Sequence, residues 1–364
     1  MRQEYLVLKS LVKMFGSGKD AVRAVDNVDL EVKEVELVTL LGPSGCGKTT
    51  TLRMIAGFEI PSSGEILIDG EEVSTTPPNK RPTTMVFQNY ALFPHLTVFQ
   101  NIAYGLKIHR DSTKNIRERA EAAMRLVGLE GLGERTPHQL SGGQQQRVSL
   151  TRSLVMEPKV LLLDEPLSNL DAKLRVSTRL EIRNLQQRLG ITTVYVTHDQ
   201  EEAMSLSDRV VIMHQGIIMQ IGTPQEVYAY PVNRFVADFI GKANFLDAFI
   251  ESISADNQIV LDILGVKFQA SMKAGMFAKG EKVLIVIRPE SITLETKKPD
   301  TLVGKIAEAV YLGSQMVYVV GVENNTLIVE VANPQEHVGF KPGEEVTVAL
   351  QEKSLHILPY EKAP

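Results

Sequence analysis

Short apolar runs alternate with amphipathic stretches over the first part of this 364-residue chain. Residues 36–42 (ELVTLLG), 160–166 (VLLLDEP) and 192–199 (TTVYVTHD) are nearly continuous apolar runs. This pattern is typical of strands that are buried on both faces. Residues 48–57 (KTTTLRMIAG) have the composition of a helix that follows the first of these strands. The sequence therefore predicts a parallel α/β sheet with helices on both faces.

Two further changes of pattern divide the chain. Residues from about 89 to 159 have helical periodicity and few strand signals, which indicates a helical insert within the α/β domain. After 235–245 (FVADFIGKANF), short β-branched segments alternate with Gly, Asn, Lys and Pro turns, as in a small antiparallel barrel. We place the boundary near 241, with an α/β domain over 1–240 and an all-β domain over 241–364.

Composition narrows the class of protein. The formal net charge of −5 and the pI of about 5.9 do not indicate a general nucleic-acid binder. Cys46 is the single cysteine, which excludes an internal disulfide framework. The N-terminus lacks the apolar core of a signal peptide, and no apolar run approaches the ~20 residues that span a bilayer. We therefore expect a soluble, cytoplasmic protein whose role at a membrane depends on a partner.

The segment GPSGCGKT, from Gly42 to Thr49, matches the phosphate-loop pattern G-x-x-x-x-G-K-[ST] between a predicted strand and a predicted helix. Its glycines let backbone N–H groups surround phosphate oxygens, and the helix N-terminus favours an anion. Lys48 would place its charge on the β- and γ-phosphates, and the Thr49 hydroxyl would ligate Mg²⁺. We interpret Cys46 as a tolerated small residue rather than a nucleophile. The residues expected to contact the nucleotide are Gly42, Pro43, Ser44, Gly45, Cys46, Gly47, Lys48, Thr49 and Thr50.

Two acidic residues end the apolar run VLLL. Asp164 would contribute to the Mg²⁺ shell, and Glu165 would act as general base toward the attacking water. A strand that ends in two acids is common by itself. After a complete phosphate loop, it predicts nucleotide hydrolysis with Mg²⁺.

A second small-residue loop, LSGGQ at Leu140–Gln144, lies about 20 residues before the acidic strand. Gln88 lies in MVFQNYALFP, SNLD occupies 168–171, His198 lies in VTHD, and Phe15 lies in KMFG. In this order the motifs resemble those of ABC-type ATPases. The resemblance matches them to the signature loop, the Q-loop glutamine, the D-loop, the switch histidine and the aromatic residue that stacks on adenine.

The resemblance implies that the signature loop closes the nucleotide site of a second copy. Ser141 and Gly143 would then act in trans, at the N-terminus of a helix that begins near Gly142. Such a head-to-tail dimer has two-fold symmetry and would trap two ATP molecules. By itself, the loop is equally an ordinary helix N-terminus with Ser141 as N-cap.

The resemblance also implies individual roles at the nucleotide. His198 would contact the γ-phosphate, and Gln88 would contact Mg²⁺ and take part in catalysis. The other residues assigned to nucleotide binding are Phe15, Ser141, Gly142, Gly143, Gln144 and Asp171. For Phe15, packing in a core is the alternative.

One position departs from the family pattern. Where members carry a glycine before the strand that leads into the phosphate loop, this chain has Val35 in VKEVELVTLLG. A β-branched residue is strained at positive φ. We therefore expect a rearranged turn with no loss of the nucleotide site.

Residues 88–107 (QNYALFPHLTVFQNIAYGLK) resemble the import-type ATPases of bacterial uptake systems. The resemblance implies that the insert docks a cytoplasmic helix from each of two transmembrane permease subunits. The apolar cleft for that helix would consist of Tyr90, Leu92, Phe93 and Pro94. A partly buried aromatic cluster within a helical hairpin is the alternative.

The C-terminal segments VIRPESI (286–292) and EAVYLGS (308–314) resemble the regulatory OB-type domain of maltose, polyamine, iron and sulfate importers. OB barrels also bind nucleic acids. From Lys242 onward, however, there are 12 Lys and Arg against 16 Asp and Glu, and aromatic residues are sparse. We expect a dimerisation and regulatory module and no nucleic-acid partner.

Together, the motifs and resemblances predict an ATP-hydrolysing subunit that energises a binding-protein-dependent importer from the cytoplasmic face of the membrane. Its expected partners are a second copy, two permease subunits and, indirectly, an external substrate-binding protein. Residues 89–106, 239–245 (FIGKANF) and 311–314 (YLGS) resemble the polyamine importers and so favour a cargo such as spermidine or putrescine. Sugar, iron(III) and sulfate-type anions are alternative cargoes. A soluble ABC ATPase without a transport role is a further alternative, although this chain shows no coiled coil or tandem second ATPase.

Overall fold

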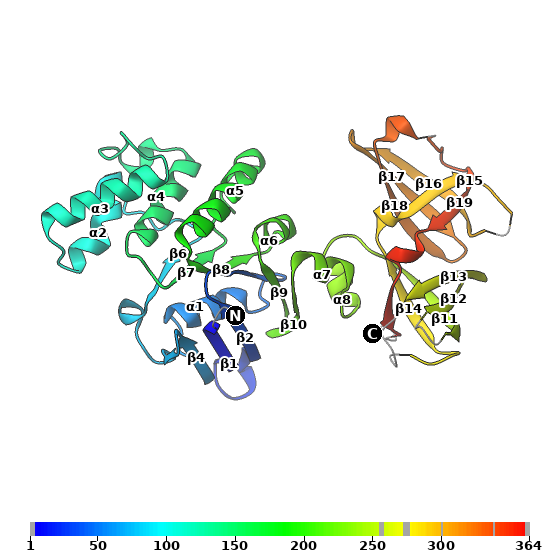
Figure 1. Cartoon of the computed structure of the whole chain (residues 1–364), viewed down its shortest axis with the longest axis horizontal. Coiled ribbons are helices and arrows are strands. Elements are labelled where there is room, and N and C mark those ends of the chain that lie inside the picture. The colour runs from blue at the N-terminus through cyan, green and yellow to red at the C-terminus, as the bar shows by residue number, and fades with distance from the viewer. Residues whose placement is uncertain (1–3, 255–257, 272–276, 300, 338, 361–364) are drawn as a thin grey trace. The chain divides into compact units, whose positions relative to one another are not determined.

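The computed structural model describes residues 4–254, 258–271, 277–299, 301–337 and 339–360. Its contacts divide the chain into two compact units, Met1–Gln225 and Glu226–Pro364 (Figure 1). The division falls before the boundary expected near 241. Arg288, in the second unit, donates hydrogen bonds to the carbonyl oxygens of Tyr228 (3.0 Å) and Ala237 (2.8 Å), which holds this segment to the second unit.

The centre of the first unit is a six-stranded sheet with the order β10-β9-β3-β8-β7-β6. Only β10 is antiparallel to its neighbour, so the other carboxyl ends meet at one edge. The strands are β3 (Leu37–Leu41), β6 (Thr83–Val86), β7 (Val160–Asp164), β8 (Thr192–Thr197), β9 (Arg209–His214) and β10 (Ile217–Gly222).

Both faces of this sheet are buried, which explains the continuous apolar runs in its sequence. In β7, Leu162 packs with α1 residues on one face, whereas Leu161 and Leu163 pack with α4, α5 and α6 residues on the other. This alternation confirms the predicted sheet with helices on both faces. The four helices are α1 (Lys48–Ala56), α4 (Gly142–Leu154), α5 (Ala172–Leu189) and α6 (Gln200–Leu206).

A smaller antiparallel sheet, of order β2-β1-β4-β5, shares the core on the α1 side. Leu6 and Leu8 of β1 belong to the same buried cluster as Leu52 of α1. The sequence analysis had not identified this sheet. Its strands are β1 (Glu4–Phe15), β2 (Val22–Lys33), β4 (Ser63–Ile68) and β5 (Glu71–Glu72).

The stretch expected to be a helical insert contains α2 (Val98–Ile108), α3 (Thr113–Leu126) and α4. These helices are grouped together in Figure 1 and share a core that includes Ile102, Ala120 and Val148. Thr97 caps α2, where its side chain accepts a hydrogen bond from the Gln100 backbone. Among the described residues, no helix is both long and apolar enough to cross a bilayer.

The second unit consists mainly of two five-stranded antiparallel sheets, β13-β12-β11-β14-β20 and β15-β19-β16-β17-β18. Residues of both sheets, including Ile285 and Val320, form one apolar core, so the predicted all-β domain is confirmed. Its helices are α7 (Pro224–Ala229), whose first two residues precede the division, and α8 (Arg234–Phe239). Its strands are β11 (Asn244–Ile253), β12 (Gln258–Ile263), β13 (Val266–Ser271), β14 (Lys282–Ile287), β15 (Ile292–Thr296), β16 (Val303–Tyr311), β17 (Gln315–Val322), β18 (Asn325–Ala332), β19 (Glu345–Leu350) and β20 (His356–Pro359).

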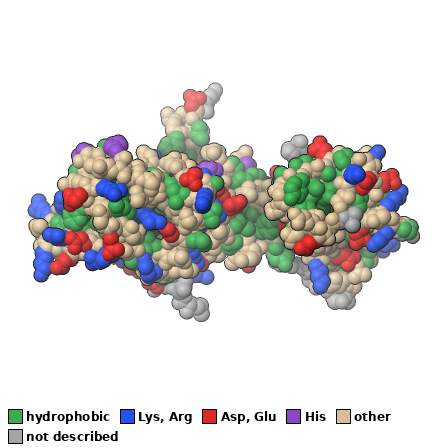
Figure 2. All heavy atoms as spheres, turned by 90° about the horizontal axis from the view of Figure 1, so that it is seen from above, with side chains coloured by type: hydrophobic (Ala, Val, Ile, Leu, Met, Phe, Trp, Pro, Cys, Tyr) green, Lys and Arg blue, Asp and Glu red, His purple; other side chains and the backbone are tan. Residues whose placement is uncertain are grey.

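Charges of both signs are mixed on the surface of this unit. On the face shown in Figure 2, Lys and Arg side chains are interspersed with Asp and Glu. Several of them pair directly, as Lys267 does with Glu251 (2.6 Å) and Lys297 with Glu345 (2.6 Å). This arrangement differs from the continuous basic stripe that tracks a nucleic-acid backbone.

Candidate functional site

The phosphate loop (Gly42–Thr49) connects β3 to α1, as its sequence context predicted. Two of its glycines have no room for a side chain. A Cβ on Gly42 would lie 2.3 Å from the Met213 carbonyl oxygen, and one on Gly47 would lie 2.5 Å from the Ala24 carbonyl oxygen. Gly47 also has a φ of +105°, a conformation that L side chains rarely adopt. The loop therefore depends on glycine at both positions.

Lys48 lies in the first turn of α1, and its side chain is folded back over the loop. Its Nζ donates hydrogen bonds to the carbonyl oxygens of Gly42 (2.7 Å) and Pro43 (2.9 Å), and the residue is only 5% exposed. Cys46 is also buried, and burial raises the pKa of its thiol, although Lys48 opposes the shift. A protonated, buried thiol agrees with a packing role for Cys46 rather than a nucleophilic one.

Thr49 and Asp164 join the phosphate loop to the end of β7. The Thr49 hydroxyl donates to Asp164 Oδ1 over 3.2 Å. Burial raises the pKa of Asp164, and the hydrogen bond from Thr49 opposes that shift. Within the described residues, no three His, Cys, Asp or Glu side chains form a metal cluster. One carboxylate and one hydroxyl nevertheless suit Mg²⁺, which completes its shell with water and phosphate oxygens.

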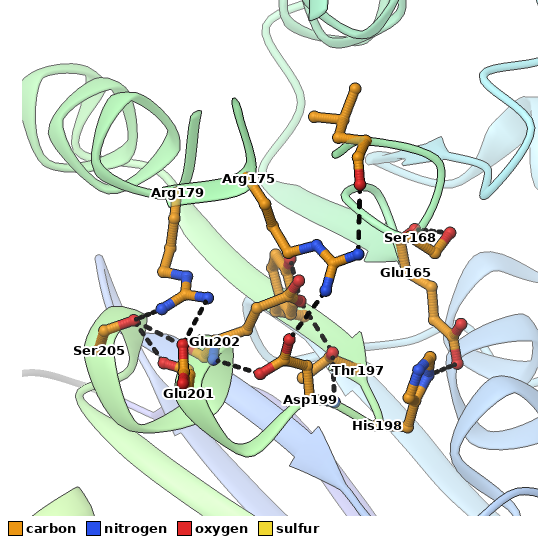
Figure 3. Close-up of polar contacts among 12 residues, drawn as sticks. Glu165, Ser168, Arg175, Arg179, Thr197, His198, Asp199, Glu201, Glu202 and Ser205 are labelled. Atoms are coloured by element: carbon orange, nitrogen blue, oxygen red, sulfur yellow. Dashed lines mark hydrogen bonds and ion pairs between the residues drawn. The ribbon is translucent and has the colours of Figure 1, made fainter. Parts of the chain in front are cut away.

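Glu165 follows β7, and its carboxylate contacts two of the other predicted residues. Oε1 lies 3.1 Å from Nδ1 of His198, and Oε2 accepts a hydrogen bond from Gln88 Nε2 over 3.3 Å. Figure 3 shows Glu165 and His198 directed toward each other. Gln88, Glu165 and His198 lie just beyond the carboxyl ends of β6, β7 and β8, which are neighbours in the parallel sheet. Sheet order therefore brings together three residues that are distant in sequence.

The D-loop (168–171) is hydrogen-bonded to the backbone of Gln88 and Glu165. Ser168 Oγ donates to the Glu165 carbonyl oxygen (2.9 Å), and Asn169 Nδ2 donates to the Gln88 carbonyl oxygen (2.7 Å). Asp171 caps α5, where its Oδ1 accepts from the Leu174 backbone over 2.9 Å. The sequence analysis named Asp171 as a site residue but missed the contact of Asn169, for which the local sequence carries no signal.

The signature loop (Leu140–Gln144) forms the N-terminus of α4. Ser141 and Gln144 make a capping box, in which each side chain accepts a hydrogen bond from the other residue's backbone. Ser141 and Gly142 are exposed. Gly143 is buried, and a Cβ there would lie 3.0 Å from the Leu174 side chain. The hydrogen bonds between Ser141 and Gln144 therefore lie within the N-terminal turn of α4.

The two apolar site predictions have different surroundings. Phe15 ends β1, is 41% exposed, and has Lys13 Nζ 4.9 Å from its ring centre, so one aromatic ring remains accessible. Tyr90 is only 5% exposed and cannot line an open cleft, contrary to the expectation. Leu92 and Phe93 are partly buried and Pro94 is exposed.

The turn at Val35 corrects another expectation. Val35 has a φ of +62°, so the turn keeps the left-handed conformation instead of rearranging. Its backbone N–H donates to Thr192 Oγ1 (3.0 Å), and its carbonyl oxygen accepts from Gln186 Nε2 (3.1 Å). These contacts hold the strained backbone in place.

The family model "ABC transporter" matches residues 25–168, and the model "TOBE domain" matches residues 285–358. The chain is 48% identical to the spermidine/putrescine import ATP-binding protein PotA of Marinobacter nauticus, over 90% of this chain and 87% of that one. It is 45% identical to the Fe(3+) ions import ATP-binding protein FbpC of Vibrio cholerae, over 99% of both chains.

Solved structures of ABC-type ATP-binding cassettes also resemble the first unit. A dimeric, post-hydrolysis structure of the ATP-binding cassette MJ0796, bound to ADP and Pi, has a TM-score of 0.54 and 31% identity. It covers 60% of this chain and 98% of that one. The order of motifs, the geometry around Glu165 and these similarities agree. The protein therefore belongs to the import-type ATP-binding subunits of ABC transporters, which are ATPases, and its second unit contains their OB-like TOBE domain.

Proposed function

We propose that this subunit hydrolyses ATP with Glu165 as general base, and that two copies of it energise a binding-protein-dependent importer of polyamines. The position of the Glu165 carboxylate, between His198 Nδ1 (3.1 Å) and Gln88 Nε2 (3.3 Å), carries the proposal. This carboxylate lies at the sheet edge that also bears the phosphate loop. A general base needs such a place beside the reacting phosphate.

Residues at the carboxyl edge of the central sheet would carry out each step of hydrolysis. Lys48 exchanges the carbonyl oxygens of Gly42 and Pro43 for phosphate oxygens, to which its charge binds more strongly. Glu165 accepts a proton from the attacking water. His198 donates a hydrogen bond to the γ-phosphate and so stabilises the charge that develops in the transition state.

The divalent ion has a suitable pair of ligands. Thr49 and Asp164, whose oxygens are 3.2 Å apart, would hold Mg²⁺, with Gln88 as the third contact implied by the family. The bound ion would neutralise charge on the β- and γ-phosphates.

A second copy completes the site. The capping box of Ser141 leaves the N-terminus of α4 at the surface, where its dipole favours an anion. The dimeric structure of the related cassette MJ0796 supports a nucleotide-bound dimer. Ser141 and Gly143 would contact the γ-phosphate held by the partner, and Phe15 would stack on the adenine in its own chain.

The segment after Gln88 would receive the membrane subunits. Phe93 and Pro94 follow Gln88 closely, and the Phe93 ring lies 4.5 Å from that of Tyr104, which is 40% exposed. A permease helix on this patch would sense the position of Gln88. The subunit would then lie at the cytoplasmic face of the membrane, with the external binding protein acting through the permeases.

Relatives of two kinds bear on the cargo. The PotA relative of Marinobacter nauticus supports a polyamine. The FbpC relative of Vibrio cholerae aligns over 99% of this chain, which supports Fe(3+) as the second candidate. We choose the polyamine because segments 89–106, 239–245 and 311–314 also favour it.

The test is the ATPase rate of the subunit assembled with its two permeases in lipid. Binding proteins loaded with spermidine, putrescine, Fe(3+), maltose or sulfate are added one at a time. The Glu165→Gln subunit is the inactive control. We expect severalfold stimulation by the polyamine-loaded protein. Stimulation by the Fe(3+)-loaded protein alone would disprove the polyamine assignment. An ATPase rate that no binding protein changes would disprove the importer function.

A further inference from the structure

Arg175 connects two loops that both lie against Glu165. It belongs to the first turn of α5, and its guanidinium points between the D-loop and the start of α6 (Figure 3). Nη2 donates a hydrogen bond to the Leu170 carbonyl oxygen (3.2 Å), and Nη1 donates to Asp199 Oδ2 (3.3 Å). One side chain therefore binds the end of the D-loop and the residue after His198.

The two loops contact the same residue, Glu165, one at its backbone and the other at its carboxylate. On one side, Ser168 of the D-loop donates through Oγ to the Glu165 carbonyl oxygen over 2.9 Å. On the other side, His198 Nδ1 lies 3.1 Å from Glu165 Oε1. Arg175 and Asp199 complete a chain of contacts that connects the D-loop to the segment carrying His198.

Asp199 is itself firmly placed. Its Oδ1 caps α6 by accepting from the Glu202 backbone (3.1 Å), and its own N–H donates to Thr197 Oγ1 (2.9 Å). Its second carboxylate oxygen remains for Arg175. The ion pair is partly buried, with side-chain exposures of 31% for Arg175 and 23% for Asp199. Water screens such a pair less than it screens a pair on the open surface.

The shape of arginine suits this bridge. Its planar guanidinium presents several donors in a rigid fork, whereas a lysine ammonium is a single point charge. The Arg175 Nε is buried without a hydrogen-bond partner in the described part of the chain. An unpaired buried donor is unfavourable. The two Nη hydrogen bonds therefore determine the orientation of this side chain, although Nε is left without a partner.

We propose that Arg175 is a positioning residue for ATP hydrolysis, which fixes the D-loop to Asp199 and thereby keeps His198 beside Glu165. Among the described residues, its hydrogen bonds go to Leu170 and Asp199 and not to the phosphate loop, so it acts on turnover rather than on nucleotide binding. Nothing in the local sequence around Arg175 indicates this function.

The first test separates turnover from binding. We expect Arg175→Ala to lower kcat for ATP about tenfold and to leave KM within about twofold, because a misplaced catalytic group affects mainly the chemical step. Arg175→Lys should recover part of kcat, since one ammonium reaches one of the two acceptors. The measurement is steady-state ATPase activity of the full chain.

Asp199→Asn gives a second, independent test. Asparagine is as good an N-cap as aspartate, so α6 keeps its cap while the charge facing Arg175 is removed. In a double-mutant cycle, the loss in Arg175→Ala/Asp199→Asn should be clearly smaller than the product of the single losses. Losses that multiply as independent effects would show that the two residues do not act together.

Arg179 provides the matched control. It lies one turn further along α5 and also contacts α6, through Ser205 Oγ (3.3 Å) and Glu201 Oε2 (3.6 Å). In the part of the chain that the structure describes, these two contacts involve neither the D-loop nor Asp199. If Arg179→Ala lowers kcat as much as Arg175→Ala, at an equal loss of melting temperature, general α5–α6 packing explains the effect and the proposal is wrong. A kcat of Arg175→Ala within twofold of the parent would also overturn it.

Discussion

Glu165 and His198 face each other across the carboxyl ends of β7 and β8, with Oε1 of the carboxylate 3.1 Å from Nδ1 of the imidazole. Parallel pairing of the two strands sets this distance, because Leu163 pairs with Tyr195 and Asp164 with Val196. The backbone of Glu165 has a φ of +43°, which turns the chain sharply after the strand. The strand register and this turn together direct the Glu165 carboxylate toward His198, at the edge of the sheet that also carries the phosphate loop.

The first prediction concerns Glu165. Glu165→Gln should lower the ATPase rate by about 10²- to 10⁴-fold, because the amide cannot accept the proton of the attacking water. ATP binding should persist, and a dimer should accumulate on size exclusion with ATP. Glu181→Gln, which removes the ion pair with Arg147, is the matched control away from the phosphates. Hydrolysis at the parental rate in Glu165→Gln would disprove the assignment of the base.

Lys48 should determine nucleotide affinity. Its Nζ already lies 2.7 Å from the Gly42 carbonyl oxygen, within the segment that matches the phosphate-loop pattern. Lys48→Ala removes charge-assisted hydrogen bonds worth about 1.5–3 kcal/mol each, so we expect ATP to bind about 10- to 100-fold more weakly. Equilibrium binding of a fluorescent ATP analogue measures this, with the exposed Lys9→Ala as control. Unchanged affinity in Lys48→Ala would contradict the phosphate-loop geometry.

Val35 should store strain that glycine releases. A valine at a φ of +62° is unfavourable by about 1–2 kcal/mol, and the more flexible unfolded chain of a glycine variant offsets part of the gain. We expect Val35→Gly to stabilise the protein by about 0.5–1 kcal/mol, or roughly 2 °C in Tm. Val35→Ala retains a Cβ and should change little. A lower Tm for Val35→Gly would show that the side chain contributes more than the strain removes.

Glu202 should make stability depend on pH. It is buried, and burial raises the pKa of its carboxyl, although hydrogen bonds from Thr197 and Tyr195 oppose the shift. Because the folded pKa lies above the unfolded one, ionisation costs stability as the pH rises through the two values. Below both values, the carboxyl is neutral in both states and the cost is absent.

Glu202→Gln keeps an acceptor for the two hydroxyls and removes this ionisation. We expect its Tm to exceed that of the parent increasingly as the pH rises above the ordinary pKa of a glutamate, about 4.3. Glu201→Gln is the control, since the Glu201 side chain is 81% exposed and should retain the parental profile. Parallel profiles of parent and Glu202→Gln would show that Glu202 titrates normally.

Several features of the fold could be predicted because they depend on local pattern. Continuous apolar runs marked β3, β7 and β8, since a strand covered on both faces needs no polar alternation. The sheet of β1, β2, β4 and β5 was missed because its alternating strands carry weaker signals. The burial of Tyr90 was also missed, since the same aromatic residue suits a surface cleft and a core.

The sequence alone determined the chemistry available in each loop. Glycines at 42 and 47, Lys48, the acids at 164 and 165, and the cap at Ser141 act through backbone geometry and neighbours a few residues away. Such short-range requirements leave a recognisable spacing. The nucleotide class therefore followed from the motifs before any fold was known.

Only the tertiary structure decided which of these groups meet. Strand order and register place Gln88, Glu165 and His198 at one edge, and α5 carries Arg175 to Asp199. It also showed that Val35 keeps a left-handed turn, because Thr192 and Gln186 hold its backbone from distant segments. Contacts of this kind depend on how separate elements pack, and packing leaves no fixed spacing along the chain.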